Sequence, residues 1–211
     1  MVLEIQNLEQ YYGTLQVLNI DSWKIGHGIF WIHGENGAGK STFFRSLAGM
    51  LPCSGSIIVD EKFDFKAQPV EYRRRINLGE AEPLYPSFLT PADLLSFVAE
   101  AKKSPSGQMD MLIEALGINY LKHPFGSCSC GMVKKVSLAV AFLGNPSVII
   151  LDEPLITIDK EARQALFGLV QNYYDSGVTF LISSHQLFQQ EGLEVTESYA
   201  LENKTLLKLE K

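Results

Sequence analysis

Apolar residues along the chain fall into two kinds of segment. Short uninterrupted or nearly uninterrupted runs are typical of strands buried on both faces of a sheet. They occur at 29–32, 148–151 and 178–182. Apolar residues that recur every three or four positions indicate helices, and we expect these at 42–50, from Pro91 onward, at 109–116 and at 133–143. Shorter strands are predicted at 3–8, 17–20, 56–59 and 75–78.

This alternation of strands and helices predicts an α/β fold with a mostly parallel sheet that is covered on both sides. Ligands of such sheets bind at the carboxyl ends of the strands. Polar clusters follow three of the predicted strands, at 34–42, 152–153 and 183–185. We therefore expect these three clusters to meet in one site.

Composition narrows the class of protein. The 211 residues are enough for one sizeable domain, and 46 % hydrophobic with 20 % charged residues is ordinary for a globular chain. The net charge of −6 argues against nucleic acid as the main partner, because a surface that follows phosphates needs a basic excess. The one tight basic cluster, at 72–75, is interpreted as solvated surface.

Two further features concern the compartment. The N-terminus has no basic segment followed by an apolar one, and no stretch of about 18 apolar residues occurs, so we expect neither a secretory signal nor a membrane span. Cys53, Cys128 and Cys130 form neither a disulfide framework nor a paired CxxC zinc motif. A reducing compartment is the natural interpretation.

The segment from Gly34 to Ser41 matches the phosphate-binding pattern GxxxxGK[ST] without a gap. Its glycines let main-chain N–H groups approach phosphate oxygens, and the following helix N-terminus adds a partial positive charge. Lys40 can reach the β- and γ-phosphates, and the Ser41 hydroxyl can bind Mg²⁺. The predicted phosphate-binding residues are Gly34, Glu35, Asn36, Gly37, Ala38, Gly39, Lys40, Ser41 and Thr42.

Asp152 and Glu153 directly follow the apolar run 148–151. Beside a phosphate loop, this arrangement predicts that Asp152 holds Mg²⁺ and that Glu153 orients or deprotonates the attacking water. The predicted cofactors are therefore ATP and Mg²⁺.

Several motifs together resemble the ABC ATPases, over essentially the whole chain. Besides the phosphate loop, the resemblance rests on Tyr12-Gly13 (adenine-stacking loop), 129–136 (signature motif), 151–154 (Walker B), Ile158-Asp159 (D-loop) and Ser184-His185 (switch histidine). The resemblance implies a P-loop NTPase core with an antiparallel β subdomain, over about 1–89 and 146–211, and a small helical subdomain over about 90–145.

The resemblance also implies a mechanism. ATP binds one subunit, with Tyr12 on the adenine, and a second subunit, in an ATP-dependent homodimer, closes over the γ-phosphate with Ser129 and the main chain at Gly131. His185 contacts the γ-phosphate or the attacking water. A separate transmembrane permease subunit converts closure into transport, so the chain is expected on the cytoplasmic face of a membrane.

The chain departs from the family pattern at two places. Cys128 and Cys130 replace the usual leucine and glycine of the signature motif, and we expect this to reduce turnover without abolishing it. Glu80 falls where the family has a magnesium-binding glutamine, with Glu82 as the alternative position. A carboxylate there can still bind Mg²⁺.

Two other functions stay open at this point: a soluble ABC ATPase, and a nucleotide-binding regulatory subunit with poor turnover. Plainer interpretations also remain for Tyr12 as a half-buried aromatic residue, Asp159 as a surface carboxylate or helix cap, and His185 as a structural histidine. The transported substrate is not encoded here, because its contacts lie in another subunit.

Overall fold

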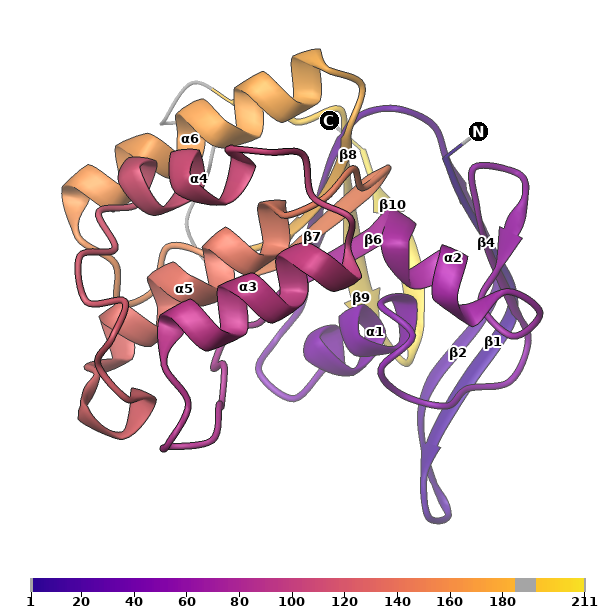
Figure 1. Ribbon diagram of the computed structural model, residues 1–211. Coiled ribbons are helices and arrows are strands. Elements are labelled where there is room, and N and C mark those ends of the chain that lie inside the picture. The colour runs from indigo at the N-terminus through magenta and orange to yellow at the C-terminus, as the bar shows by residue number, and fades with distance from the viewer. Residues whose placement is uncertain (1, 185–192, 211) are drawn as a thin grey trace.

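The computed structural model describes residues 2–184 and 193–210, which form two sheets and the helices around them (Figure 1). The strands are β1 Leu3–Tyr12, β2 Leu15–Ile25, β3 Ile29–His33, β4 Ser56–Val59, β5 Phe63–Asp64, β6 Ile76–Gly79, β7 Val148–Asp152, β8 Thr179–Ser183, β9 Glu197–Glu202 and β10 Thr205–Leu209. The helices are α1 Lys40–Leu47, α2 Pro69–Arg75, α3 Pro91–Ala101, α4 Gln108–Ala115, the short 3-10 helix η1 Phe125–Ser127, α5 Cys130–Phe142 and α6 Lys160–Asp175.

The larger sheet has six strands in the order β10-β9-β3-β8-β7-β6. All neighbouring pairs are parallel except β9 with β10. The three apolar runs of the sequence become β3, β7 and β8 at its centre, so the prediction of a mostly parallel sheet is confirmed. The polar residues that directly follow these three parallel strands therefore start at the same edge of the sheet.

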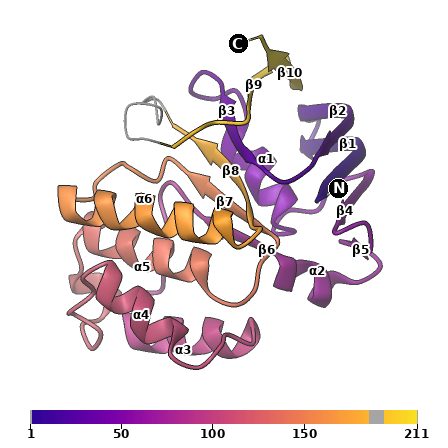
Figure 2. The same ribbon diagram turned by 90° about the horizontal axis from the view of Figure 1, so that it is seen from above.

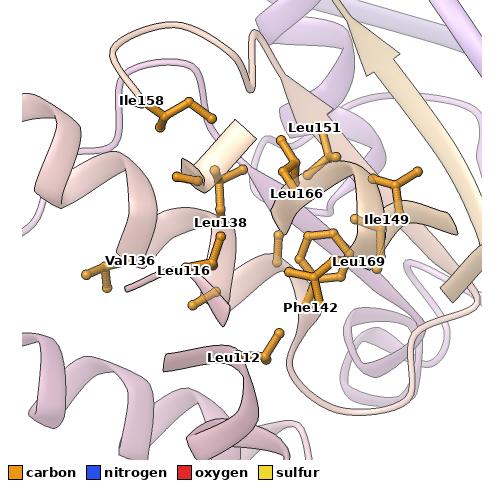
Figure 3. Close-up of a cluster of buried hydrophobic side chains, with 14 of the residues drawn as sticks. Leu112, Leu116, Val136, Leu138, Phe142, Ile149, Leu151, Ile158, Leu166 and Leu169 are labelled. Atoms are coloured by element: carbon orange, nitrogen blue, oxygen red, sulfur yellow. The ribbon is translucent and has the colours of Figure 1, made fainter. Parts of the chain in front are cut away.

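Both faces of this sheet are covered, because successive side chains of a strand point to opposite faces. Ile149 and Leu151 pack in the same core as the buried residues of α4, α5 and α6 (Figure 3). Val148 and Ile150 pack in a second core with α1 and the smaller sheet. Viewed from above, α5 and α6 lie on one side of β7 and β8, and α1 lies on the other (Figure 2).

The smaller sheet, β2-β1-β4-β5, is antiparallel throughout. Leu3, Ile5 and Leu8 are the buried apolar positions of β1, as their spacing predicts, and the polar Gln10 is buried as well. The long β1–β2 hairpin projects from the body of the molecule (Figure 1). Its turn, beside Gly13, carries the exposed side chain of Tyr12.

The helices α3, α4, η1 and α5 follow one another between β6 and β7. Thr90 caps α3 and Pro91 is its first residue, as the sequence predicts. Helix α5 starts at Cys130, three residues before the predicted start. These helices fill the range 90–145; its division from the rest of the chain as a subdomain stays a prediction.

Candidate nucleotide-binding site

The phosphate loop connects the buried strand β3 to helix α1. Gly39 precedes the first helical residue and has a φ of 101°, a left-handed conformation that favours glycine. A Cβ atom on Gly39 would lie 3.1 Å from a methyl carbon of Val17. The first turn of α1 carries no acidic side chain, so its N-terminal partial charge is left for an anion.

Lys40 folds back over the loop. Its Nζ donates to the main-chain oxygens of Gly34, at 2.7 Å, and Glu35, at 3.2 Å. The Ala38 amide donates to the Glu35 oxygen at 3.1 Å, which closes the loop. A cation held this way lies at the centre of the loop that is predicted to bind phosphate.

Three side chains meet beside the loop, each from a different element. The Ser41 hydroxyl of α1 donates to Asp152 of β7 at 2.6 Å, across 111 positions of sequence. The Ser183 hydroxyl of β8 donates to the other carboxylate oxygen of Asp152 at 2.6 Å. Ser183 also accepts from the Glu153 amide at 3.0 Å. Described residues of all three predicted polar clusters therefore converge in one place.

Glu153 follows the last residue of β7 and is buried. Its φ of 43° lies in the left-handed region, which is uncommon for a residue with a long side chain. Backbone strain of this kind costs on the order of 1–3 kcal/mol and is concentrated at functional sites. The chain bends at Glu153, directly after β7, where it enters the site.

A cavity of about 750 Å³ joins these groups. Tyr12, Val17 and Arg45 also line it, so one cavity extends from the β1–β2 hairpin to the end of β7. Of the predicted phosphate-loop residues, Gly34 and Ala38 do not line this cavity. Those that do are Glu35, Asn36, Gly37, Gly39, Lys40, Ser41 and Thr42, together with Asp152 and Glu153.

A smaller cavity of about 300 Å³ adjoins Lys40 and Glu153, and Gly34 and Ser184 line it as well. His33 also lines this cavity, although it belongs to none of the motifs of the sequence. Burial, and then the charge of Lys40, lower the pKa of His33. In the sequence, only its position directly before Gly34 could have indicated that His33 lies near the site.

Glu80, the predicted additional metal ligand, pairs with an arginine. Its carboxylate accepts from Arg45 Nε at 2.7 Å, and Glu80 does not line the larger cavity. Arg45 holds the side chain because an ion pair satisfies a partly buried carboxylate. Glu82, the alternative position, lines the cavity.

The signature segment lies apart from this cavity, which neither Ser129 nor Gly131 lines. The Ser129 hydroxyl accepts from the Met132 amide at 3.2 Å and caps α5. Gly131 is packed closely, because a Cβ atom there would lie 2.6 Å from the Thr157 oxygen. Cys130, the first residue of α5, is exposed.

Asp159 and His185 are the remaining residues of the predicted motifs. Asp159 caps α6 by accepting from the Ala162 amide at 2.8 Å, and it pairs with Lys135 at 2.5 Å. Asp159 is therefore a helix cap, and its place in the D-loop stays a prediction. His185 lies outside the described residues, so its position in the site is not tested.

Comparison with known proteins decides the family. The family model described as ABC transporter matches residues 18–156, a span that contains the phosphate loop, the signature segment and Asp152-Glu153. The chain belongs to the ABC transporter family. It is an ATP-binding subunit of that family and an ATPase, as the sequence motifs predict. None of the helices within residues 2–184 and 193–210 combines the length and the apolar character that a membrane crossing needs.

Two curated relatives and one solved structure illustrate the match. The lantibiotic transport ATP-binding protein SrtF of Streptococcus pyogenes is 29 % identical over 211 residues, which cover 99 % of this chain and 91 % of that protein. The spermidine/putrescine import ATP-binding protein PotA of Thermotoga maritima is 30 % identical, over 95 % of this chain and 56 % of that protein. A solved ATP-binding subunit of an ABC transporter superposes with a TM-score of 0.87 at 25 % identity, over 99 % of this chain and 90 % of that one.

Proposed function

We propose that the chain binds ATP with Mg²⁺ in the larger cavity, hydrolyses it as one half of a homodimer, and drives transport through a separate membrane subunit. The observation that carries the proposal is the hydrogen bond of 2.6 Å between Ser41 and Asp152. It joins the end of the phosphate loop to the carboxylate after β7, where a triphosphate and its metal need both.

The loop residues supply the triphosphate contacts in this proposal. Main-chain amides of residues 34–42 donate to phosphate oxygens, and Lys40 exchanges its bonds to Gly34 and Glu35 for bonds to the β- and γ-phosphates. Tyr12, at the hairpin end of the cavity, stacks on the adenine. Tyr12 and Glu153 both line this cavity, so one bound nucleotide can contact both residues.

The donor atoms beside the loop fit Mg²⁺. Ser41 and Asp152 offer oxygen atoms that already lie within hydrogen-bonding distance, and Mg²⁺ prefers oxygen ligands. Ser183 fixes the orientation of Asp152 from behind. We place Glu82, rather than Glu80, as the additional carboxylate on this side. When bound, Mg²⁺ neutralises charge on the phosphate oxygens.

Glu153 orients the attacking water and accepts its proton. This role is supported by the position of Glu153, which is buried and, like Lys40, lines both cavities. We keep the proposed contact of His185 with the γ-phosphate or the water. Ser129 and Gly131 lie away from the chain's own cavity, so we assign them to the γ-phosphate of a second copy.

The decisive experiment for catalysis is Glu153→Gln. A positioned general base contributes about 10²–10⁴-fold, so hydrolysis falls at least about a hundredfold. Binding of ATP, measured by calorimetry with Mg²⁺, stays, because the phosphate loop is intact. Hydrolysis within threefold of the unsubstituted protein would remove Glu153 from the proposed role.

A groove of about 480 Å³, lined by residues of α2, α3 and α5, is the observation that supports a membrane partner. It is mainly apolar, with the exposed side chains of Met50, Val70 and Phe97 along it, and two arginines, Arg73 and Arg74, line it as well. Exposed apolar patches of this kind are typical of interaction sites. We place there an amphipathic, acidic cytoplasmic segment of the membrane subunit.

Phe97→Asp tests this contact in the organism that makes the protein. In a membrane flotation experiment, the tagged chain at its native level is expected to move with the membranes. Phe97→Asp is expected to release it, because the carboxylate of the new aspartate opposes docking in an apolar groove. Phe88→Asp is the matched control, because Phe88 is 77 % exposed and lies outside the groove. Equal membrane association of both variants would refute the placement.

A further inference from the structure

Lys134 is a buried lysine in the first turns of α5, shortly after the signature residues. Its side chain is almost fully enclosed, with 1 % exposed. Its Nζ donates to three main-chain oxygens, those of Glu80 at 2.5 Å, Asp152 at 2.9 Å and Ala81 at 3.2 Å. One ammonium group therefore ties helix α5 to two parts of the site, the segment that follows β6 and the end of β7.

The three acceptors lie at the ends of neighbouring strands. Glu80 and Ala81 directly follow β6, and Asp152 is the last residue of its parallel neighbour β7. Helix α5 carries Lys134 one turn beyond its cap, Ser129. The ammonium thus connects the signature helix to the strand end that carries Asp152 and Glu153.

Enclosing an ammonium group away from water is costly unless hydrogen bonds compensate. Burial lowers the pKa of Lys134 to about 8, against the opposing charges of Asp152, Glu153, Glu80 and Glu82. A buried charge that bonds only to main-chain oxygens fixes their relative positions. An apolar side chain could fill the same volume but could not hold those oxygens.

We propose that Lys134 is a positioning residue for ATP hydrolysis, which holds Asp152, and Glu153 after it, in register with the signature helix. Loss of the ammonium frees the end of β7 and the 80–82 segment from α5. Glu153 then loses its placement against the attacking water, whereas the phosphate loop keeps its own contacts. Loss of the ammonium therefore lowers kcat and leaves the affinity for ATP nearly unchanged.

Lys102 provides a matched control. It is the C-cap of α3, and its Nζ donates to main-chain oxygens of Arg73 and Ile76. Burial lowers its pKa to about 8 as well. Ile76 begins β6, so the Lys102 contacts lie at the opposite end of the strand from those of Lys134.

The experiment compares Lys134→Met with Lys102→Met in thermal unfolding and in steady-state hydrolysis per mole of folded protein. Both substitutions change stability. Only Lys134→Met is expected to lower kcat, by at least about tenfold, because misplacing a catalytic group by about 1 Å can cost about a hundredfold. KM for ATP stays within about threefold, and Lys134→Arg, which keeps a charged donor, recovers part of kcat.

Two results would overturn the assignment. One is a Lys134→Met kcat within twofold of that of Lys102→Met; the other is a loss confined to KM. Should the methionine variant not fold, Lys134→Gln, which carries an uncharged donor on a side chain one atom shorter, is measured in the same way. A glutamine variant with unaltered kcat contradicts the proposal equally, since its single amide cannot hold three oxygens.

Discussion

At the scale of single residues, Asp152 and Glu153 adjoin each other but have different surroundings. Asp152 accepts hydrogen bonds from Ser41 and Ser183, which fix the direction of its carboxylate oxygens toward the phosphate loop. Glu153 takes a left-handed backbone conformation and faces both cavities. The sequence predicted these two roles from the order of residues alone. The part played by Ser183 depends on the register of β8 against β7, which no local pattern reports.

Ser183→Ala tests this arrangement. The substitution removes one donor to Asp152 and the acceptor for the Glu153 amide, so kcat is expected to fall about tenfold or more. Stability should fall by about 1–3 kcal/mol, the cost of leaving buried polar groups unsatisfied. Steady-state kinetics and thermal unfolding provide the two measurements.

Ser147→Ala is the control for that substitution. Ser147 lies just before β7, and its hydroxyl donates to the carboxylate of Asp60 at the far end of the strand. The Ser147→Ala variant is expected to be less stable than the unsubstituted protein and to have the same kcat. Equal losses of kcat in the two variants would show that the effect comes from general loosening of β7.

At the scale of elements, the central buried strands and the start of α3 were predictable, whereas helices α2 and α6 and strands β5, β9 and β10 were missed. The uninterrupted apolar runs identified β3, β7 and β8 because strands buried on both faces need no polar alternation. Helix α6 was missed, although its buried positions Ala162, Leu166, Leu169 and Val170 have helical spacing. The place of Glu80 could not be predicted, since Arg45 reaches it from α1, and that contact exists only in the folded chain.

The caps of α5 and α3 allow structural and functional effects to be separated. Ser129→Ala and Thr90→Ala each remove a side chain that accepts from the third residue of its helix. Each is expected to cost about 1 kcal/mol of stability in chemical denaturation. Only Ser129→Ala should also lower ATP hydrolysis, since Ser129 is proposed to meet a partner's γ-phosphate. Similar hydrolysis by the two variants would leave Ser129 as a cap alone.

At the scale of the whole molecule, two cores on opposite faces of one sheet hold the strand ends in a fixed arrangement. The sequence predicted that 34–42 and 152–153 would meet there, and the structure brings them together through Ser41 and Asp152. It could not show the distance between the signature segment and the cavity, which depends on how α5 packs. That separation is why the proposed site needs a second copy.

Dimerisation follows as a prediction for the intact protein. Glu153→Gln with ATP and Mg²⁺ is expected to elute at twice the mass of the chain in light-scattering chromatography, because slow hydrolysis preserves the closed pair. Without nucleotide the same variant should elute as a monomer. A single mass at all ATP concentrations would contradict the proposed closure over the γ-phosphate.

The account depends most directly on the grip of the phosphate loop on a triphosphate. Calorimetric titration of ATP with Mg²⁺ into the unsubstituted chain and into Lys40→Ala measures it. The substitution removes a charge-assisted hydrogen bond worth about 1.5–3 kcal/mol, so affinity is predicted to fall at least about tenfold. Equal affinity of the two proteins for ATP would contradict the site described here.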